Sequence, residues 1–359
     1  MAGSCPPAER LWRLPRRCPR AGFLAGLGAS CTLVLAACGG TASAPAQSAQ
    51  ASQPAQAAAK LVVGYSNIAG DEIPLWLAKD AGIFDGNGLN VDLQYLAGGT
   101  KAIAALVAGD LQVSSQGGGE LMGAVSGGAD LVAIANLGPV YPFELEVTPD
   151  IKATADLKGK KVGVASIGGA SDIAARVVLR KNGLDPDKDV SIIAVGDART
   201  AKSALQSGAI QGTVLSPPST VEVEAGGAHP LYNLAALKLP NTQGLITLQR
   251  SWLNANRATA QKLVDALVQA TARTKHDPAA AKDVIRKYYK LDDAKAVDAT
   301  YDFYTQEVYA DYPYPRADQF TDALSELSKK SEQLKGFDPN KIIDDSLVKS
   351  AEQRAVASK

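Results

Sequence analysis

Residues 105–112 read ALVAGDLQ, and residues 204–211 read ALQSGAIQ, a shift of 99 positions. The same shift aligns further positions without a gap: Val63 and Gly64 with Val162 and Gly163, Gly70 with Gly169, and Val91 with Val190. Self-similarity at a fixed spacing indicates one structural unit that is present twice. The spacing exceeds the roughly 20 to 50 residues of solenoid repeats, so the repeat predicts two similar lobes.

Each copy of the repeat alternates predicted strands and helices. In the first copy, strands are expected at residues 61–65, 91–96 and 111–116, with helices at 74–79 and 101–108. In the second copy, strands are expected at residues 161–166, 190–195 and 210–215, with helices at 171–181 and 201–206. This alternation predicts an α/β fold with two lobes, each a parallel-rich sheet flanked by helices.

The connections between the lobes are expected in two extended segments. Prolines interrupt residues 139–149, and residues 244–249 (GLITLQ) precede a long helical stretch on the return. We assign residues 60–147 and 248–359 to lobe 1 and residues 148–247 to lobe 2. The helices predicted after residue 254 complete lobe 1. With 46% hydrophobic residues in 359, the chain has enough apolar side chains for two modest cores.

The N-terminal residues have the order of a secretory signal. Five arginines precede an uncharged apolar stretch, residues 21–37, which ends on small residues before Cys38. Residues 35–38 (LAAC) resemble the lipobox of bacterial lipoproteins, which implies cleavage before Cys38 and acylation of that cysteine. Several acyl chains together anchor a protein firmly to a membrane. We therefore assign residues 1–37 to a signal peptide.

Residues 38–59 are expected to comprise the lipidated cysteine and a flexible tether. Alanine, glutamine, serine and proline dominate this segment, which lacks the large apolar residues needed for packing. Two alternatives stay open. The first is a retained transmembrane helix, because the apolar stretch 21–37 reaches the lower end of the roughly 17 to 25 residues that span a bilayer. The second concerns the export route, because Arg16-Arg17 also permits twin-arginine export.

Removal of the signal changes the charge and the cysteine content of the chain. Subtracting five arginines and Glu9 from 37 basic and 37 acidic residues leaves 32 and 36, a net charge near −4. No basic patch remains, so nucleic acid is not an expected partner. Cys38 is then the one cysteine left. The folded body has no thiol, which excludes disulfides, thiolate nucleophiles and cysteine-based metal sites.

Candidate ligand-binding residues follow the predicted strands. In parallel sheets, ligands bind at the carboxyl ends of strands, where helix N-termini present free N–H groups. The alternative is that Thr100 and Ser171 are helix caps and the glycines form turns. Trp76 and Tyr141 are candidates for an apolar wall or a stacking surface, with burial in the core as the alternative. The predicted ligand-binding residues are Ser66, Asn67, Trp76, Gly98, Gly99, Thr100, Ser115, Tyr141, Gly168, Gly169, Ser171 and Ser216.

Searches for catalytic and metal motifs find none. The chain lacks GxSxG, HExxH and a phosphate-binding GxxxxGK[ST] loop, and neither His229 nor His276 has a second histidine at ligand spacing. We expect no catalytic residue, no metal and no cofactor. Asp71 and Glu72 suit a helix N-terminus. If these two carboxylates face the cleft, they favour an amine over an anion.

Residues 63–112, 157–164 (LKGKKVGV) and 337–348 (FDPNKIIDDSLV) resemble the substrate-binding lipoproteins of ABC importers. The most similar branch includes binders of nitrate, sulfonates, taurine and thiamine-pyrimidine precursors. The resemblance implies a type II periplasmic-binding-protein fold, without enzymatic activity, that delivers one small molecule to a permease and an ATPase. It also implies a monomer held outside the cytoplasm by the lipid on Cys38. The cleft positions carried over are Ser66, Asn67, Gly99, Thr100, Ser115, Gly169 and Ser171.

The expected ligand is a small organic molecule, either sulfonate-bearing or aromatic. A cleft arginine is not evident in the sequence, which argues against a simple oxyanion, and Trp76 and Tyr141 favour an organic ligand. Two other functions stay open. One is a sensory lipoprotein that presents its ligand to a membrane receptor. The other is an enzyme similar to the fungal pyrimidine synthases, which rely on a cysteine-rich motif and histidines.

Overall fold

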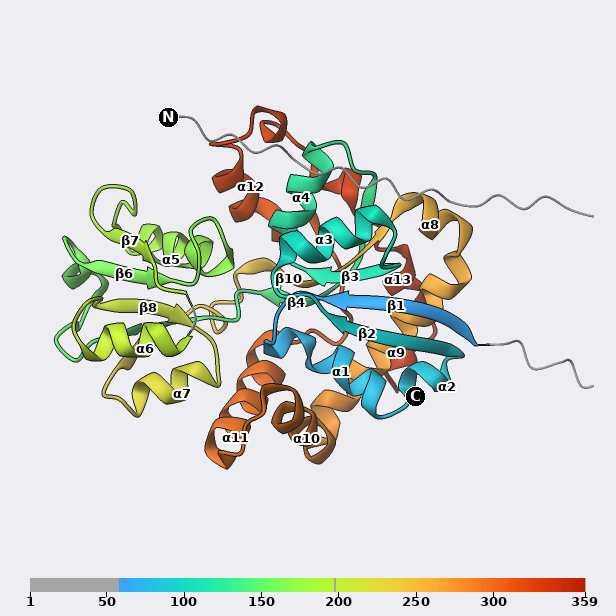
Figure 1. The fold of residues 1–359 in the computed structure, drawn as a ribbon, viewed down its shortest axis with the longest axis horizontal. Coiled ribbons are helices and arrows are strands. Elements are labelled where there is room, and N and C mark those ends of the chain that lie inside the picture. Colours follow the sequence, from blue (N-terminus) through green and yellow to red (C-terminus); the bar gives the residue numbers. More distant parts are fainter. Residues whose placement is uncertain (1–57, 197, 359) are drawn as a thin grey trace, which may run out of the picture. The chain divides into compact units, whose positions relative to one another are not determined.

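The first sheet has five strands in the order β2-β1-β3-β10-β4 (Figure 1). The computed structural model describes residues 58–196 and 198–358, so the predicted signal peptide, Cys38 and most of the tether lie outside the described residues. β1 pairs in parallel with β2 and β3, and β10 runs antiparallel to β3 and β4. The strands are β1 Ala59–Tyr65, β2 Leu89–Tyr95, β3 Val113–Gln116, β4 Leu131–Val140 and β10 Pro240–Gln249.

The second sheet repeats this plan with the order β7-β6-β8-β5-β9. β6 pairs in parallel with β7 and β8, and β5 runs antiparallel to β8 and β9. The strands are β5 Glu144–Val147, β6 Lys161–Val164, β7 Ser191–Ala194, β8 Gly212–Leu215 and β9 His229–Asn233. Each sheet therefore combines a parallel trio from one repeat copy with one antiparallel strand, β10 or β5, and a last strand paired antiparallel to it. This arrangement confirms the predicted two-lobed α/β fold.

Helices flank both sheets in the predicted order. The first lobe contains α1 Ile73–Asp80, α2 Ile83–Gly86, α3 Gly99–Ala108 and α4 Gly118–Ser126, and the second contains α5 Ala170–Lys181, α6 Ala198–Gln206 and α7 Ser219–Glu224. The C-terminal part adds α8 Arg250–Ala255, α9 Arg257–His276, α10 Pro278–Tyr289, α11 Ala294–Phe303, α12 Thr321–Leu327 and α13 Ser346–Gln353. Within the described residues, no helix combines the length and the apolar character needed to cross a bilayer.

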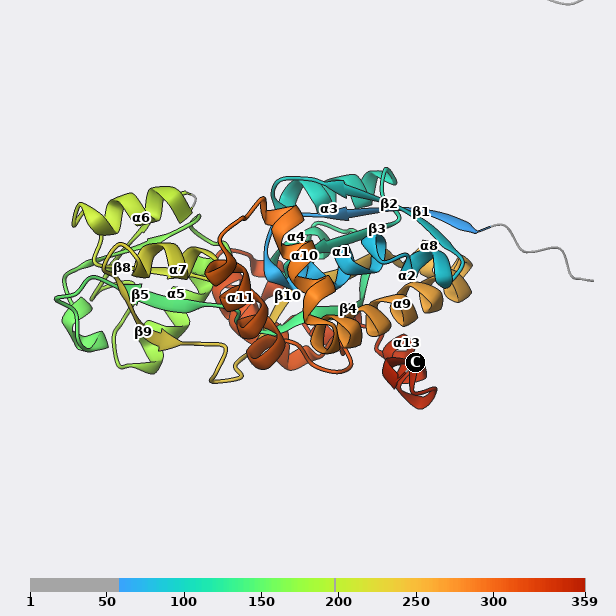
Figure 2. The ribbon, with the colours of Figure 1, turned by 90° about the horizontal axis from the view of Figure 1, so that it is seen from below.

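The long helix α9 builds the core of the first lobe. Its Leu263, Val264 and Leu267 are fully buried in one cluster with Leu61 and Val63 of β1. Figure 2 shows α9 along the first sheet with α13 beside it. The C-terminal helices thus complete the first lobe by covering apolar surface that the repeat copy leaves open.

The first crossing lies within the segment expected from the sequence, whereas residues 244–249, expected to form the second connection, are part of β10 in the first sheet. β5 pairs with β8 and β9, so residues 144–147 belong to the second sheet rather than to lobe 1. β10 belongs to the first sheet from Pro240 onward, eight residues before the expected return to lobe 1 at residue 248. The crossings therefore span residues 141–143 and 234–239. Pro142 lies in the first crossing, but Pro139 lies within β4. Pairing with strands that are distant in the sequence decides the lobe to which each segment belongs.

Gly70 joins the first repeat copy to the C-terminal helices by a close contact. It begins the helical turn Gly70–Glu72, and a Cβ atom placed on it would lie 2.1 Å from the ring of Tyr304. Tyr304 is fully buried in the π-helical turn Tyr304–Val308 and also contacts the rings of Phe303 and Tyr309. Because the ring is enclosed, it has little room to move away from an added methyl group.

We expect Gly70→Ala to lower the free energy of unfolding by about 1–3 kcal/mol, because the methyl group overpacks against Tyr304. Urea unfolding followed by circular dichroism measures this change. Gly86→Ala is the control, because no atom lies within 4 Å of its added Cβ and alanine is the better helix former in α2. Equal stabilities of the two variants would contradict the proposed contact.

Candidate functional site

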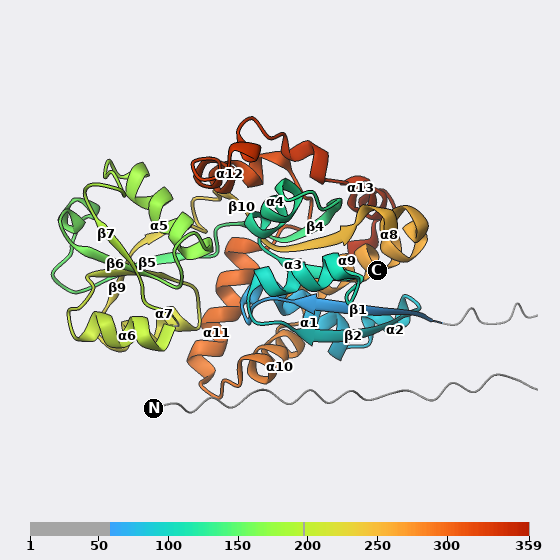
Figure 3. The same ribbon diagram turned by 45° about the horizontal axis from the view of Figure 1, so that its top comes forward.

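A cavity of about 1200 Å³ lies between the two lobes. The first turns of α3, α4 and α5 all line it, together with residues of α12 and the start of β10. Figure 3 shows α3, α4 and α12 on the first lobe and α5 on the second. The residues that line the cavity include Ser66, Asn67, Gly98, Gly99, Thr100, Ile103, Ala104, Val107, Gly117, Gly118, Gly119, Glu120, Gly168, Gly169, Ala170, Ile173, Asn241, Gln243 and Leu327.

The helix starts bring backbone N–H groups to the cavity wall, one of which, that of Gly118, already donates to Thr242 Oγ1 at 3.1 Å. The first N–H groups of a helix have no partner within the helix, and the helix dipole adds a partial positive charge there. The first residues of the three helices, Gly99, Gly118 and Ala170, line the cavity. Such an arrangement suits an acceptor-rich or anionic group of a ligand.

Glu120 is the charged residue of this lining, and no lysine, arginine or histidine of the described chain joins it. A Cβ atom on Gly99 would lie 2.6 Å from its Oε1 atom, and one on Gly117 would lie 2.7 Å from its Oε2 atom. Glycine at these positions therefore lets the carboxylate approach the start of α3. The carboxylate is placed to interact with the positive end of that helix dipole.

Three amide side chains of the lining carry polar atoms without a hydrogen-bond partner. These buried atoms are Asn67 Oδ1, Asn241 Nδ2 and Gln243 Oε1. Buried polar atoms are nearly always paired in native proteins, so unpaired atoms on a cavity wall are available to a ligand. The remaining wall is aliphatic, with Ile103, Val107, Ile173 and Leu327. The cavity wall thus combines polar and apolar groups.

Seven of the predicted site residues line the cavity: Ser66, Asn67, Gly98, Gly99, Thr100, Gly168 and Gly169. Three further lining residues, Glu120, Asn241 and Gln243, were not predicted from the sequence. The sequence does contain a signal for Glu120, because it follows a run of three glycines, residues 117–119, directly after β3. Asn241 and Gln243 have no comparable signal, because β10 reaches the first sheet only after the chain returns from the second lobe.

The other five predicted residues lie away from the cavity in this structure. Trp76 is fully buried and stacks on Tyr288 at a centroid distance of 4.6 Å, because α9 and α10 cover the outer face of α1. The hydroxyl of Ser115 donates to Glu72 Oε1 at 2.7 Å, and Ser171 accepts from the Ala165 N–H at 3.0 Å. The Tyr141 hydroxyl donates to Asp322 at 3.2 Å, and Ser216 is half-buried beyond the lining.

A buried acid pair, Asp71 and Glu72, lies behind the cavity wall at the end of β1. Both side chains are fully buried. Burial raises the pKa of Asp71 to about 7, an effect that its own backbone N–H and Asn67 partly offset. Burial and the charge of Asp71 raise the pKa of Glu72 well above its usual value, and Ser115 opposes this shift. The pair is therefore held largely protonated at mildly acidic pH.

Asp71→Asn should remove a pH-dependent loss of stability. Because the pKa of Asp71 is higher in the folded than in the unfolded state, its favourable contribution is complete below about pH 4 and is lost as the pH rises to about 7. We expect the free energy of unfolding of the variant to gain on that of the wild type across this interval. Urea titrations at pH 4 to 8 measure the difference, with the exposed Asp85→Asn as control. A constant difference across that range would contradict the protonated pair.

The two sheets of like topology, joined by two crossings and enclosing a cavity between them, define a protein with the two-lobed periplasmic-binding-protein fold. Solved structures share this fold. A Bordetella bronchiseptica RB50 protein is 26% identical with a TM-score of 0.66, covering 83% of this chain and 98% of its own. The aliphatic sulphonate binding protein SsuA from Escherichia coli is 22% identical with a TM-score of 0.65, covering 76% and 87%.

Residues 70–281 match the family described as NMT1/THI5 like, and the chain belongs to that family. A candidate binding protein of Brucella abortus (strain 2308) is 29% identical over 222 residues, which cover 61% of this chain and 68% of the relative. A second candidate binding protein, YtlA of Bacillus subtilis (strain 168), is 23% identical over 280 residues, covering 76% and 83%. The family resemblance expected from the sequence is confirmed.

Proposed function

We propose that this protein is an extracytoplasmic solute-binding lipoprotein of an ABC importer. It holds one small organic molecule in the cavity between its lobes and delivers that molecule to a permease and its ATPase. The observation that carries the proposal is the meeting of three helix starts from two lobes in one cavity. A site divided between two lobes is suited to close around its ligand by a hinge movement.

The chemistry of the lining favours a ligand with an acceptor-rich head group, such as a sulfonate, on a short aliphatic body. Backbone N–H groups and the unpaired Asn241 Nδ2 suit the head group. Ile103, Ile173 and Leu327 suit the body. Trp76 and Tyr141 lie outside the lining, so they do not offer a stacking surface to a ligand in the cavity and no longer favour an aromatic ligand. Glu120 supplies a carboxylate for an amino group, if the ligand carries one.

We further propose that residues 1–37 are removed as a signal peptide and that lipid on Cys38 holds the protein at the membrane. Residues 38–59 would then tether the body, which acts as a monomer. Support comes from the residue pattern alone: basic residues, an apolar stretch, LAAC at residues 35–38, and a polar low-complexity segment. Mass spectrometry of the mature N-terminus tests both steps, since an unmodified Cys38 or a retained residue 37 would overturn them.

Thermal unfolding in the presence of alkanesulfonates, taurine, nitrate, pyrimidines and aromatic acids identifies the ligand class. A ligand at about 100 times its dissociation constant stabilises the folded protein by about 2.7 kcal/mol, which raises the midpoint by several degrees. We expect an alkanesulfonate or a similar aliphatic acid to give the largest rise. A rise with pyrimidines alone would contradict the proposed ligand chemistry but not the binding function.

Ala104→Trp should abolish that rise without unfolding the protein. Ala104 is exposed on the cavity side of α3, so an indole there fills the ligand space. Ala279→Trp, on the exposed surface of α10 outside the lining, is the matched control and should bind normally. Equal binding by the two variants would place the ligand elsewhere. Ligand-stimulated ATP hydrolysis by the permease and ATPase in liposomes then separates an importer from a sensory protein.

A further inference from the structure

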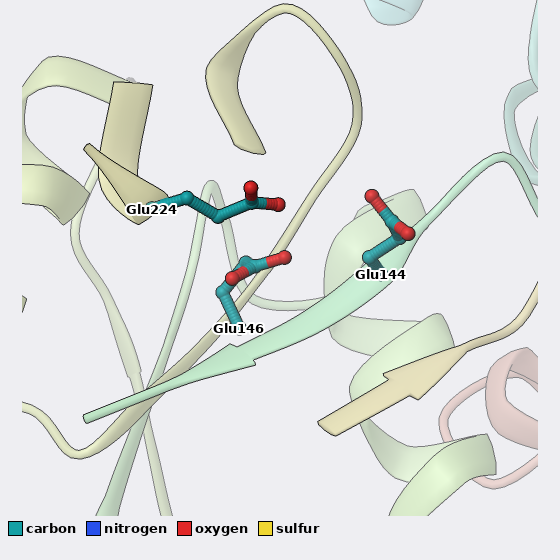
Figure 4. A group of neighbouring side chains, drawn as sticks. All are labelled: Glu144, Glu146 and Glu224. Atoms are coloured by element: carbon teal, nitrogen blue, oxygen red, sulfur yellow. The ribbon is translucent and has the colours of Figure 1, made fainter. Parts of the chain in front are cut away.

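Three glutamates of the second lobe form a cluster outside the interlobe cavity. One carboxylate oxygen from each of Glu144, Glu146 and Glu224 lies within 4.8 Å of the others. Figure 4 shows the three side chains directed toward one another, two from β5 and one from the end of α7. None of the three lines the cavity. The cluster therefore needs an explanation separate from the binding of the transported solute.

The local fold fixes this arrangement. Residues two apart on a strand point to the same face, so Glu144 and Glu146 lie side by side on β5. A register shift between β5 and β9 falls at Leu145 and Glu146, and such irregularities re-aim side chains. α7 ends with Glu224 against this face. Three carboxylates from two elements are thus held together by backbone geometry.

Glu146 is the member that most clearly lacks a partner. Its side chain is fully buried, and neither of its carboxylate oxygens accepts a hydrogen bond. Burial raises its pKa to about 8, and the charged neighbours that raise it further are Glu224 and Glu144, both acidic. Thr220 opposes a similar rise at Glu144. A buried carboxyl group with two acidic neighbours and no donor is costly in its charged form, so it is held protonated unless a cation joins it.

We propose that Glu144, Glu146 and Glu224 bind one hard divalent cation, with Ca²⁺ as the expected ion. Carboxylate oxygens are the ligands that Ca²⁺, Mg²⁺ and Mn²⁺ prefer, and the cluster contains no nitrogen or sulfur donor. Ca²⁺ accepts irregular arrangements of six to eight oxygen ligands, whereas Mg²⁺ demands near-ideal octahedral geometry, so a cluster of three glutamates with water is better suited to Ca²⁺. The half-exposed Glu144 and exposed Glu224 leave one side open for water ligands.

The bound ion ties α7 to β5. β5 begins directly after the crossing at residues 141–143, so the ion stabilises the part of the second lobe that follows the first connection. Its binding energy is available only to the folded chain, because the three ligands converge only when α7 packs on β5. The inference does not rest on the identity of the transported solute.

The test measures thermal unfolding of the full chain in detergent, first stripped with EDTA and then titrated with CaCl₂ to about 10 mM, a range that covers weak extracellular sites. We expect the midpoint of the wild type to rise by several degrees and isothermal titration to give one Ca²⁺ per chain. Glu146→Gln should abolish the rise. In EDTA, this variant should be at least as stable as the wild type, because it removes like-charge repulsion.

Two further variants keep the test decisive. Glu224→Gln changes an exposed ligand and should fold normally yet lose the response to CaCl₂. Glu222→Gln is the matched control, because Glu222 is exposed on the same helix, two residues away and outside the cluster. An unchanged midpoint of the wild type in CaCl₂ would overturn the proposal. So would a response of Glu224→Gln equal to that of Glu222→Gln.

Discussion

Parallel pairing of β1 with β2 and β3, and of β6 with β7 and β8, is the constraint on which the binding region depends. In parallel strands all carboxyl ends lie at one edge of the sheet, and each following helix begins there. Two such sheets therefore each offer an edge with helix starts and small residues. The cavity lies where these edges meet, and its donors are backbone groups that any sequence with this topology carries.

Local sequence signals were sufficient for most elements and for the loops after the strands. The helix expected at residues 101–108 is α3 Gly99–Ala108, and the strand expected at 161–166 is β6 Lys161–Val164. Seven residues of the cavity wall were predicted because glycines and hydroxyl residues follow strands in both repeat copies. These short signals were informative because they occur after strands in both copies of the repeat.

Features that depend on contacts between segments far apart in the sequence could not be predicted. Trp76 looks available at a helix start, but α9 and α10, encoded about 200 residues later, bury it. The lobe assignment of residues 144–147 depends on pairing with β8 and β9. Glu224 joins Glu144 and Glu146 only through the packing of α7 on β5. No local pattern encodes such contacts.

The carboxyl group of Glu120 lies in the cavity wall beside Gly99. A free anion approaching from solution meets a wall without a positive side chain in the described lining, so no strong field draws it inward. A simple ion interacts with this wall through its charge alone, so the interaction does little to compensate for the loss of its hydration water. A larger solute also gains apolar contact with Ile103 and Leu327. Discrimination between solutes then depends on their shape and length, and changes little with the salt concentration.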